Sequence, residues 1–189
     1  MGCQVSLVQY AEHPENVRAL ILICGSYGHM TSTFHGVPIL EFVLPTIARA
    51  VLDRPNLARA VWSRISPAFA FKVAGKVREI DPERLRPEDF LPYLEHLRRV
   101  DLPMFLRMMR AAGEHTAKDI LPRVKVPTLV IGGERDTFTP PFLAREMAEA
   151  IPGAELMIVE RGSHVAFLEQ HEIVNERIFR FLRERVLQN

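Results

Sequence analysis

The chain is poor in cysteine, because its 189 residues include only Cys3 and Cys24, which form no CxxC pair. A disulfide framework or a cysteine zinc site is therefore not expected, and the thiol content fits a reducing, cytoplasmic setting. The longest strictly apolar run, Ala19–Cys24, is far shorter than the roughly 20 residues that span a bilayer. No basic segment followed by an apolar one marks a secretory signal at the start. We therefore expect no membrane partner.

An excess of charge of either sign is also lacking. The 24 Lys and Arg residues against 23 Asp and Glu residues leave a net charge of +1, which gives no electrostatic footprint for nucleic acid. The seven histidines show no H-x-H or H-E-x-x-H spacing, so no metal is expected. Gly132-Gly133 alone is not a phosphate-binding loop, and we expect no cofactor.

The first six residues admit two interpretations. Met1-Gly2-Cys3-Gln4-Val5-Ser6 fits the M-G-x-x-x-[ST] pattern of N-myristoylation, with a cysteine beside it that could be palmitoylated. The same residues also begin a segment with the apolar spacing of a helix. We favour the helix, because it accounts for the same residues and the lipidation pattern is short.

Two apolar runs near the C-terminus each end in a turn of small residues that carries one polar group. Val126–Pro140 (VPTLVIGGERDTFTP) carries Asp136, and Glu155–Phe167 (ELMIVERGSHVAF) carries His164. A short apolar run bounded by turn residues predicts a buried strand, here Thr128–Ile131 and Glu155–Val159. The helices predicted between and after these strands cover Pro141–Ile151 and His171–Leu187. Alternation of strand and helix predicts parallel strands.

The N-terminal residues predict one helix and one strand. Apolar residues at helical spacing predict a helix over Gly2–Glu12, which Pro14 ends. Val17–Cys24 (VRALILIC) follows as a strand. Its core is apolar on successive residues, so it belongs inside a parallel sheet that helices cover on both faces.

Residues 29–121 have a different character. Prolines punctuate segments of helical periodicity, and no alternating strand pattern intervenes. The predicted helices are Val37–Leu52, Asn56–Ile65, Ala68–Val77, Pro87–Val100 and Pro103–Gly113. The segment is rich in Phe and Met, which predict core packing for most of these side chains and an apolar pocket for the remainder.

Gly133–Pro140 (GERDTFTP) and Gly162-Ser163-His164 resemble the C-terminal signature of the α/β-hydrolase superfamily, in which an acid follows one late strand and a histidine follows the last. MGCQV and HPENVRALILIC resemble the segment directly after the family's nucleophile elbow, G-x-S-x-G. The resemblance implies an α/β fold: the C-terminal half of an α/β-hydrolase, with about three parallel strands and flanking helices, interrupted by an all-helical cap. The implied domains are 1–28 (hydrolase core), 29–121 (cap) and 122–189 (hydrolase core).

The resemblance also implies site roles. His164 would act as the base that takes a proton from the nucleophile, and Asp136 would orient it and stabilise its cation. Met1 aligns with the position directly after the nucleophile, whose backbone nitrogen helps to form the oxyanion hole. The nucleophile would then precede Met1 and is not in this chain. Cys3 lies inside the predicted helix, and no elbow surrounds Ser26, Ser32 or Ser163.

The implied function is hydrolysis of a carboxylic ester or related bond in a small or medium-sized apolar substrate. Without the nucleophile we expect an N-terminally truncated chain that is inactive alone. One alternative is a non-catalytic remnant that binds a partner or an apolar ligand. Another is an epoxide hydrolase or dehalogenase, if the missing nucleophile is Asp. The free apolar edge of the strand Val17–Cys24 predicts self-association.

Overall fold

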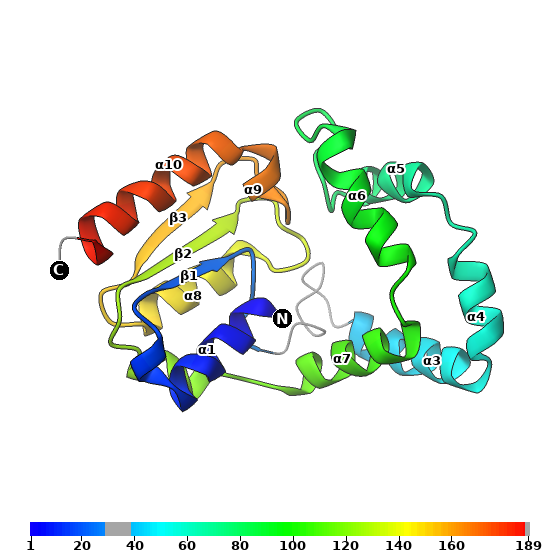
Figure 1. Ribbon diagram of the computed structural model, residues 1–189, viewed down its shortest axis with the longest axis horizontal. Helices are drawn as coiled ribbons and strands as arrows, with labels where there is room; N and C mark the ends of the chain where they lie inside the picture. The colour runs from blue at the N-terminus through cyan, green and yellow to red at the C-terminus, as the bar shows by residue number, and fades with distance from the viewer. Residues whose placement is uncertain (29–38, 188–189) are drawn as a thin grey trace.

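The computed structural model describes residues 1–28 and 39–187. Three parallel strands form one sheet in the order β1-β2-β3 (Figure 1). They are β1 (Leu20–Ile23), β2 (Thr128–Gly133) and β3 (Glu155–Val159). All six residues of β2 are buried, as expected of a central strand. The predicted parallel sheet is confirmed, although β1 is shorter than the predicted strand Val17–Cys24.

Helices cover both faces of this sheet and produce a three-layer arrangement (Figure 1). The elements are α1 (Gly2–Glu12), α8 (Pro141–Ala150), α9 (Ala166–Glu169) and α10 (His171–Phe181), with short helical turns η1 (Pro14–Asn16), η3 (Lys118–Arg123) and η4 (Leu182–Val186). The bounds of α1 agree with the prediction. The last predicted helix is α-helical to Phe181 and continues as a π-helical turn to Val186, one residue short of the predicted end.

Side-chain alternation along the strands assigns each face its own core. Leu22 and Val130 point to the face that α1, η3 and α8 cover, with Leu7 and Met147 among their neighbours. Leu129, Ile131 and Val159 belong to the other core, which α9 and α10 close with residues such as Phe181. Successive residues of a strand point to opposite faces, so the continuous apolar runs in the sequence supply both cores at once.

Helix α1 packs tightly against the loop that follows β1. A Cβ atom on Gly25 would lie 2.2 Å from the Cys3 Sγ, so only glycine allows this approach. A Cβ on Gly2, in contrast, would meet nothing within 4 Å. Cys3 is 6% exposed, and burial raises the pKa of its thiol. The contact places the N-terminus of α1 beside the carboxyl end of β1.

The five predicted helices of the middle segment are all present. They form the helical block, which consists of α3 (Ile39–Asp53), α4 (Pro55–Trp62), α5 (Pro67–Lys76), α6 (Pro87–Arg98) and α7 (Leu102–Glu114). Two helices begin at side-chain caps: Ser66 Oγ accepts a hydrogen bond from the Phe69 amide at 3.1 Å, and Asp101 accepts one from the Met104 amide at 2.7 Å. The start predicted at Val37 lies outside the described residues.

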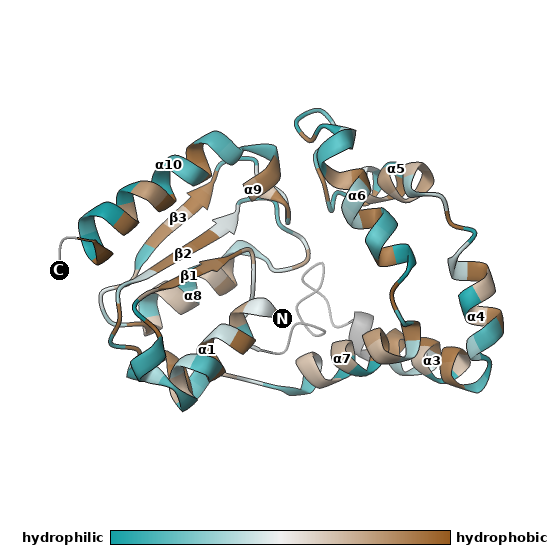
Figure 2. Ribbon diagram, in the orientation of Figure 1, coloured by the Kyte–Doolittle hydropathy of each residue, from teal (hydrophilic) through white to brown (hydrophobic). Residues whose placement is uncertain are grey.

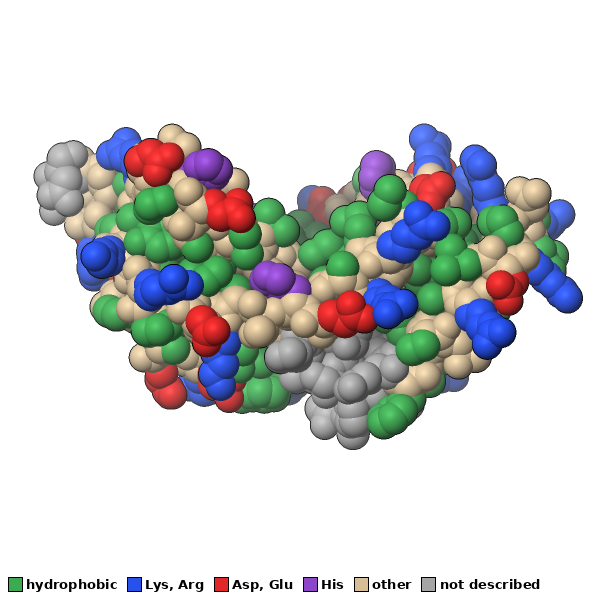
Figure 3. Space-filling view, turned by 90° about the horizontal axis from the view of Figure 1, so that it is seen from below, with side chains coloured by type: hydrophobic (Ala, Val, Ile, Leu, Met, Phe, Trp, Pro, Cys, Tyr) green, Lys and Arg blue, Asp and Glu red, His purple; other side chains and the backbone are tan. Residues whose placement is uncertain are grey.

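The helical block lies beyond the carboxyl ends of the strands (Figure 1). Its two ends meet beside the sheet, where Gly28 and Thr116 form an isolated antiparallel bridge. The Ala117 amide donates a hydrogen bond of 2.7 Å to the Tyr27 carbonyl oxygen at the same place. The strands and the block form two lobes with a hollow between them along one side (Figure 3).

A small apolar cluster connects the block to the core. Ile80, Leu85 and Phe90 pack against Val165, which directly follows His164. The Phe71 and Phe90 rings meet edge to face at a centroid distance of 6.3 Å. Other apolar side chains of the block are exposed, among them Phe42, Phe69 and Met104. Figure 2 shows hydrophobic segments of α3 and α5 in brown. No helix within the described residues is long and apolar enough to cross a membrane.

Candidate active site

The loop after β2 holds Asp136 as a buried, fully bonded carboxylate. Its side chain has no solvent exposure. Oδ1 accepts hydrogen bonds from the amides of Phe138 at 2.9 Å and Thr139 at 2.7 Å, and Oδ2 accepts one from the Thr139 hydroxyl at 2.8 Å. A buried charge is tolerated only where such bonds replace water. The turn residues of GERDTFTP therefore fix the direction of the carboxylate.

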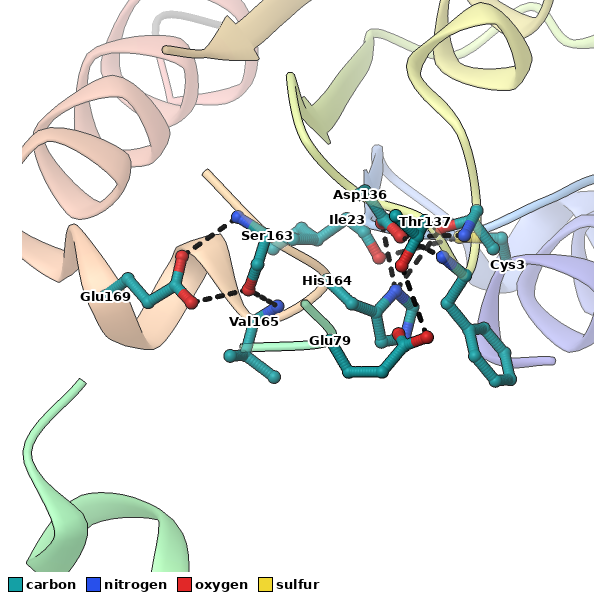
Figure 4. Close-up of polar contacts among 11 residues, drawn as sticks. Cys3, Ile23, Glu79, Asp136, Thr137, Ser163, His164, Val165 and Glu169 are labelled. Atoms are coloured by element: carbon teal, nitrogen blue, oxygen red, sulfur yellow. Dashed lines mark hydrogen bonds and ion pairs between the residues drawn. The ribbon is translucent and has the colours of Figure 1, made fainter. Parts of the chain in front are cut away.

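His164 follows β3 and meets that carboxylate. Its Nδ1 lies 2.9 Å from the Asp136 Oδ2 (Figure 4). The Phe138 ring lies against the imidazole at a centroid distance of 4.8 Å, and the His164 side chain is 31% exposed. Because a carboxylate only accepts hydrogen bonds, Nδ1 carries the proton and Nε2 is the basic nitrogen. Nε2 has no hydrogen-bond partner within residues 1–28 and 39–187.

The two loops approach each other closely because β2 ends in glycine. A Cβ atom on Gly133 would lie 2.3 Å from the Ser163 carbonyl oxygen and 2.6 Å from that of Gly162. The Arg135 amide donates a hydrogen bond of 2.8 Å to the Gly162 carbonyl oxygen, and the Glu134 amide donates one of 3.0 Å to that of Val159. The structure thus brings the two predicted site residues together, 28 positions apart in the chain.

Glu169 fixes the histidine loop from the other side, and sequence reasoning missed it. Its carboxylate accepts hydrogen bonds from the Ser163 amide at 2.9 Å and from the Ser163 hydroxyl at 2.5 Å (Figure 4). It also accepts one from the Asp81 amide at 2.7 Å. Glu169 is 8% exposed. The one sequence signal was a single acid directly after the apolar residues 165–168, and that signal alone does not distinguish a buried carboxylate from a surface one.

The linker between α5 and α6 (residues 77–86) contacts both loops. Its Asp81 amide binds Glu169, as described, and its Glu79 carboxylate accepts a hydrogen bond of 3.2 Å from the Thr137 hydroxyl. Thr137 directly follows Asp136, and Ser163 directly precedes His164. The helical block is therefore anchored next to each of the two predicted site residues.

A half-open cleft of about 720 Å³ lies between this linker and the two loops. The linker and α5 contribute one wall, and the acid and histidine loops contribute the other. Its lining residues are Gly75, Arg78, Ile80, Asp81, Pro82, Glu83, Arg135, Thr137, Arg161 and Ser163. The lining is mostly polar, so this cleft differs from the apolar pocket that the Phe and Met content predicted.

The hydroxyl and thiol groups near the site have other partners. The Ser163 hydroxyl binds Glu169, and the Ser26 hydroxyl donates a hydrogen bond of 2.5 Å to the Gly28 carbonyl oxygen. The Cys3 thiol points to the Ile23 carbonyl oxygen at 4.0 Å. Ser32 lies outside the described residues. Within the described part of the chain, no hydroxyl or thiol is bonded to the His164 Nε2.

Met1 lies half-buried at the N-terminus of α1. Burial lowers the pKa of its amine. The N-terminal end of a helix carries partial positive charge and favours an anion nearby. Within the described residues no group of three or more His, Cys, Asp or Glu side chains could hold a metal ion.

Comparison with known proteins shows which proteins this chain resembles. Residues 108–188 match the family of TAP-like proteins. A pimeloyl-[acyl-carrier protein] methyl ester esterase from Neisseria meningitidis is 26% identical over 179 residues, which cover 91% of this chain and 62% of that protein. An esterase from Exiguobacterium antarcticum superposes with a TM-score of 0.70 at 20% identity, covering 96% of this chain and 63% of that one. The chain has the α/β-hydrolase fold and resembles members of that superfamily in sequence.

The similarity is strongest in one short segment. A putative non-heme bromoperoxidase, BpoC, from Mycobacterium tuberculosis is 38% identical over 58 residues, which cover 31% of this chain and 22% of that protein. The chain spans less than two thirds of the length of each of these relatives. Together with the parallel sheet, these likenesses confirm the fold class that the sequence predicted.

Proposed function

We propose that this chain supplies the acid and the base of a hydrolase active site, with Asp136 and His164 in these roles. The observation that carries the proposal is the hydrogen bond of 2.9 Å between the Asp136 Oδ2 and the His164 Nδ1. This bond keeps the proton on Nδ1, so Nε2 is the basic nitrogen. The ring is partly exposed and lies at the carboxyl edge of a parallel sheet. Ligand sites of open α/β sheets lie at that edge.

In this proposal the imidazole accepts the proton of a nucleophile at Nε2 and returns it to the leaving group. An imidazole can both accept a proton and return it, so it suits both steps. Asp136 keeps the proton on Nδ1 and stabilises the imidazolium when it forms. Phe138 covers one side of the ring and restricts its rotation. The positive end of α1, at Met1, would stabilise an oxyanion.

We propose further that the nucleophile is joined to the N-terminal side of Met1 and that the chain alone is inactive. Three facts support this. The esterase relative is longer, with 62% of its length covered. Within the described residues no hydroxyl or thiol binds Nε2. The contact between Cys3 and Gly25 brings the start of α1 to the edge of the sheet where His164 lies.

The helical block would act as a cap over this site. Its two ends meet at Gly28 and Thr116, as expected of a segment inserted between two parts of one sheet. Its linker is bonded beside both site residues, through Glu79 and Asp81. We propose residues 1–28 and 122–189 as the hydrolase core, residues 29–121 as the cap, and a small or medium-sized ester as the substrate.

The test is hydrolysis of p-nitrophenyl butyrate by two proteins. One is this chain alone, and the other is the chain extended upstream of Met1 in the same reading frame. The extended protein should exceed the chain alone by on the order of 10² or more. His164→Ala should abolish that gain, while His171→Ala, a surface histidine on α10, should preserve it. A gain that survives His164→Ala would refute the assigned base.

The same experiment separates the alternatives. If the upstream sequence contains G-x-D in place of G-x-S, the substrate to test is an epoxide or an alkyl halide. Asp136 and His164 would then act in the second step. An extended protein without any hydrolase activity would leave a binding protein as the function, with the helical block as its ligand-binding part.

The edge of β1 supports a second proposal, which is self-association. Within the described residues β1 pairs only with β2. The amides of Leu20 and Cys24 donate hydrogen bonds toward β2, so alternation directs those of Ile21 and Ile23 to the open side. No charged residue or proline stands in Ala19–Cys24 to block pairing there.

A further inference from the structure

The cleft beside the candidate active site is lined by three arginines, one from each of the segments that form it. Arg78 comes from the α5–α6 linker, Arg135 from the loop after β2, and Arg161 from the turn after β3. All three are exposed. They are therefore distant in sequence but converge on one cavity of about 720 Å³.

None of the three guanidinium groups forms a hydrogen bond or an ion pair with any described residue. Some other arginines of this chain are paired with acids. Arg86 forms a bidentate pair with Asp89 at 2.8 and 3.0 Å, and Arg110 binds Glu114 at 2.8 Å. Each guanidinium group carries five N–H donors, so three unpaired ones around a single cleft leave donor capacity for a ligand.

Two acids also line the cleft, and their positions limit how far they neutralise it. The Asp81 carboxylate is bonded to the Glu83 amide at 3.1 Å and lies 3.7 Å from the Arg84 guanidinium. Its charge is thus already compensated from outside the cleft. The Glu83 side chain is exposed and solvated. The cleft keeps an excess of positive charge.

Two of these arginines have a left-handed backbone. Arg78 has φ 63° and Arg161 has φ 57°, and both angles are in the left-handed region. Arg78 ends α5 in a Schellman-type turn, where the Glu79 amide bonds the Ala74 carbonyl oxygen at 2.9 Å. Glycine is the residue that suits such positions, and an L side chain there costs about 1 kcal/mol. Arginine occupies both despite that cost.

We propose that Arg78, Arg135 and Arg161 form a binding subsite for an anionic group, a carboxylate or a phosphate, carried by the substrate. Guanidinium groups match both oxyanions with paired hydrogen bonds. This inference rests on the proposed function and narrows its substrate class from an apolar ester to an ester with an acidic end.

The geometry also places that acidic end near the reacting bond. Thr137 and Ser163 line the cleft, and they adjoin Asp136 and His164 in sequence. A ligand whose anion is held by the arginines would extend past these two residues toward Nε2. A short spacer between the acid and the ester follows from this arrangement.

The test measures binding by calorimetry at low ionic strength, with probes that contain no ester. The probes are inorganic phosphate, adipate and the neutral adipamide, each added to the full chain. Adipate or phosphate should bind and adipamide should not. Arg161→Gly combined with Arg135→Gln should weaken binding by about tenfold or more. Arg161→Gly relieves the left-handed backbone, so the weaker binding should occur without a decrease in the free energy of unfolding.

The matched control is Arg145→Gln, an exposed arginine on α8 that lies outside the cleft. It should bind the probes as the unchanged chain does. Binding of adipate alone would assign a carboxylate, and binding of phosphate alone would assign a phosphate-bearing ligand. No binding of either anion, or an equal loss in Arg145→Gln, would overturn the subsite. Because no probe is hydrolysed, anion binding without esterase activity in the extended protein would refute the proposed function and not the subsite.

Discussion

The carboxylate of Glu169 accepts hydrogen bonds from both the amide and the hydroxyl of Ser163, the residue directly before His164. A third bond, from the Asp81 amide, connects the same carboxylate to the helical block. The position of the imidazole therefore depends on a buried acid that takes no part in the proposed chemistry. The helical block and the histidine loop are fixed by one side chain.

Glu169→Gln tests this relationship. The amide nitrogen of Gln is a donor, so at least one of the three donors that face Glu169 would lose its acceptor. A buried donor without a partner costs about 1–3 kcal/mol, and we expect that loss in the free energy of unfolding measured with urea. Glu176→Gln, at an exposed position of α10, should change it by less than about 0.5 kcal/mol. Equal stabilities of the two variants would contradict the assigned role.

Gly133→Ala should separate the two loops. The added methyl group would lie 2.3 Å from the Ser163 carbonyl oxygen, and backbone must shift to accommodate it. We expect a loss of about 1–3 kcal/mol in stability and a changed NMR signal for the His164 imidazole. Gly2→Ala is the matched control, because its methyl group would meet nothing within 4 Å. An unchanged imidazole signal in Gly133→Ala would show that the loops tolerate the extra atom.

Asp136→Asn should weaken the control of the His164 tautomer. The proton on Nδ1 is held by a carboxylate that already accepts three other hydrogen bonds, and an amide cannot replace all four. Nitrogen NMR of the imidazole should report the Nδ1–H form in the unchanged chain and a mixture of forms in the variant. The same tautomer ratio in both proteins would remove the orienting role from Asp136.

Stability should fall at alkaline pH because of Cys24. Burial, together with the nearby Asp136 carboxylate, raises the pKa of this thiol to about 12. Above the unfolded pKa, near 9, the unfolded chain releases the proton first, so it binds fewer protons than the native state. The free energy of unfolding then decreases by up to about 1.4 kcal/mol per pH unit for this group.

Urea denaturation at pH 7.5 and pH 10 measures that decrease. Cys24→Ala should make the decrease in the free energy of unfolding smaller. The decrease due to Tyr27, whose pKa is also raised to about 12 by burial and Glu146, should remain. If the free energy of unfolding changes equally with pH in the unchanged chain and in Cys24→Ala, this assignment is contradicted.

The open edge of β1 predicts association that depends on concentration. Light scattering coupled to size-exclusion chromatography should show dimers or larger species at high protein concentration, because the amides of Ile21 and Ile23 can pair with another strand. Extension of the chain upstream of Met1 should reduce this association if the added residues cover the edge. A monodisperse monomer with a cooperative thermal transition, found for the chain alone, would refute it.

Local sequence patterns were sufficient for most of the secondary structure. The spacing of apolar residues in Gly2–Glu12 and the run Glu155–Val159 predicted α1 and β3 with the bounds that the structure has. Prolines in first turns marked the starts of α6 and α8. The strand predicted from Val17 was too long, because β1 begins only where pairing with β2 begins, at Leu20.

The sequence by itself predicted the α/β-hydrolase fold and the two polar residues that follow β2 and β3, because strands, turns and helix starts are encoded within a few neighbouring positions. The tertiary structure alone decided the rest. It placed the Asp136 carboxylate 2.9 Å from His164, buried Glu169 behind Ser163 and gathered Arg78, Arg135 and Arg161 around one cleft. The first and the last of these relations join residues far apart in the chain, and the Glu169 carboxylate also binds the distant Asp81 amide. They therefore follow from how the loops and the helical block pack and not from any local pattern.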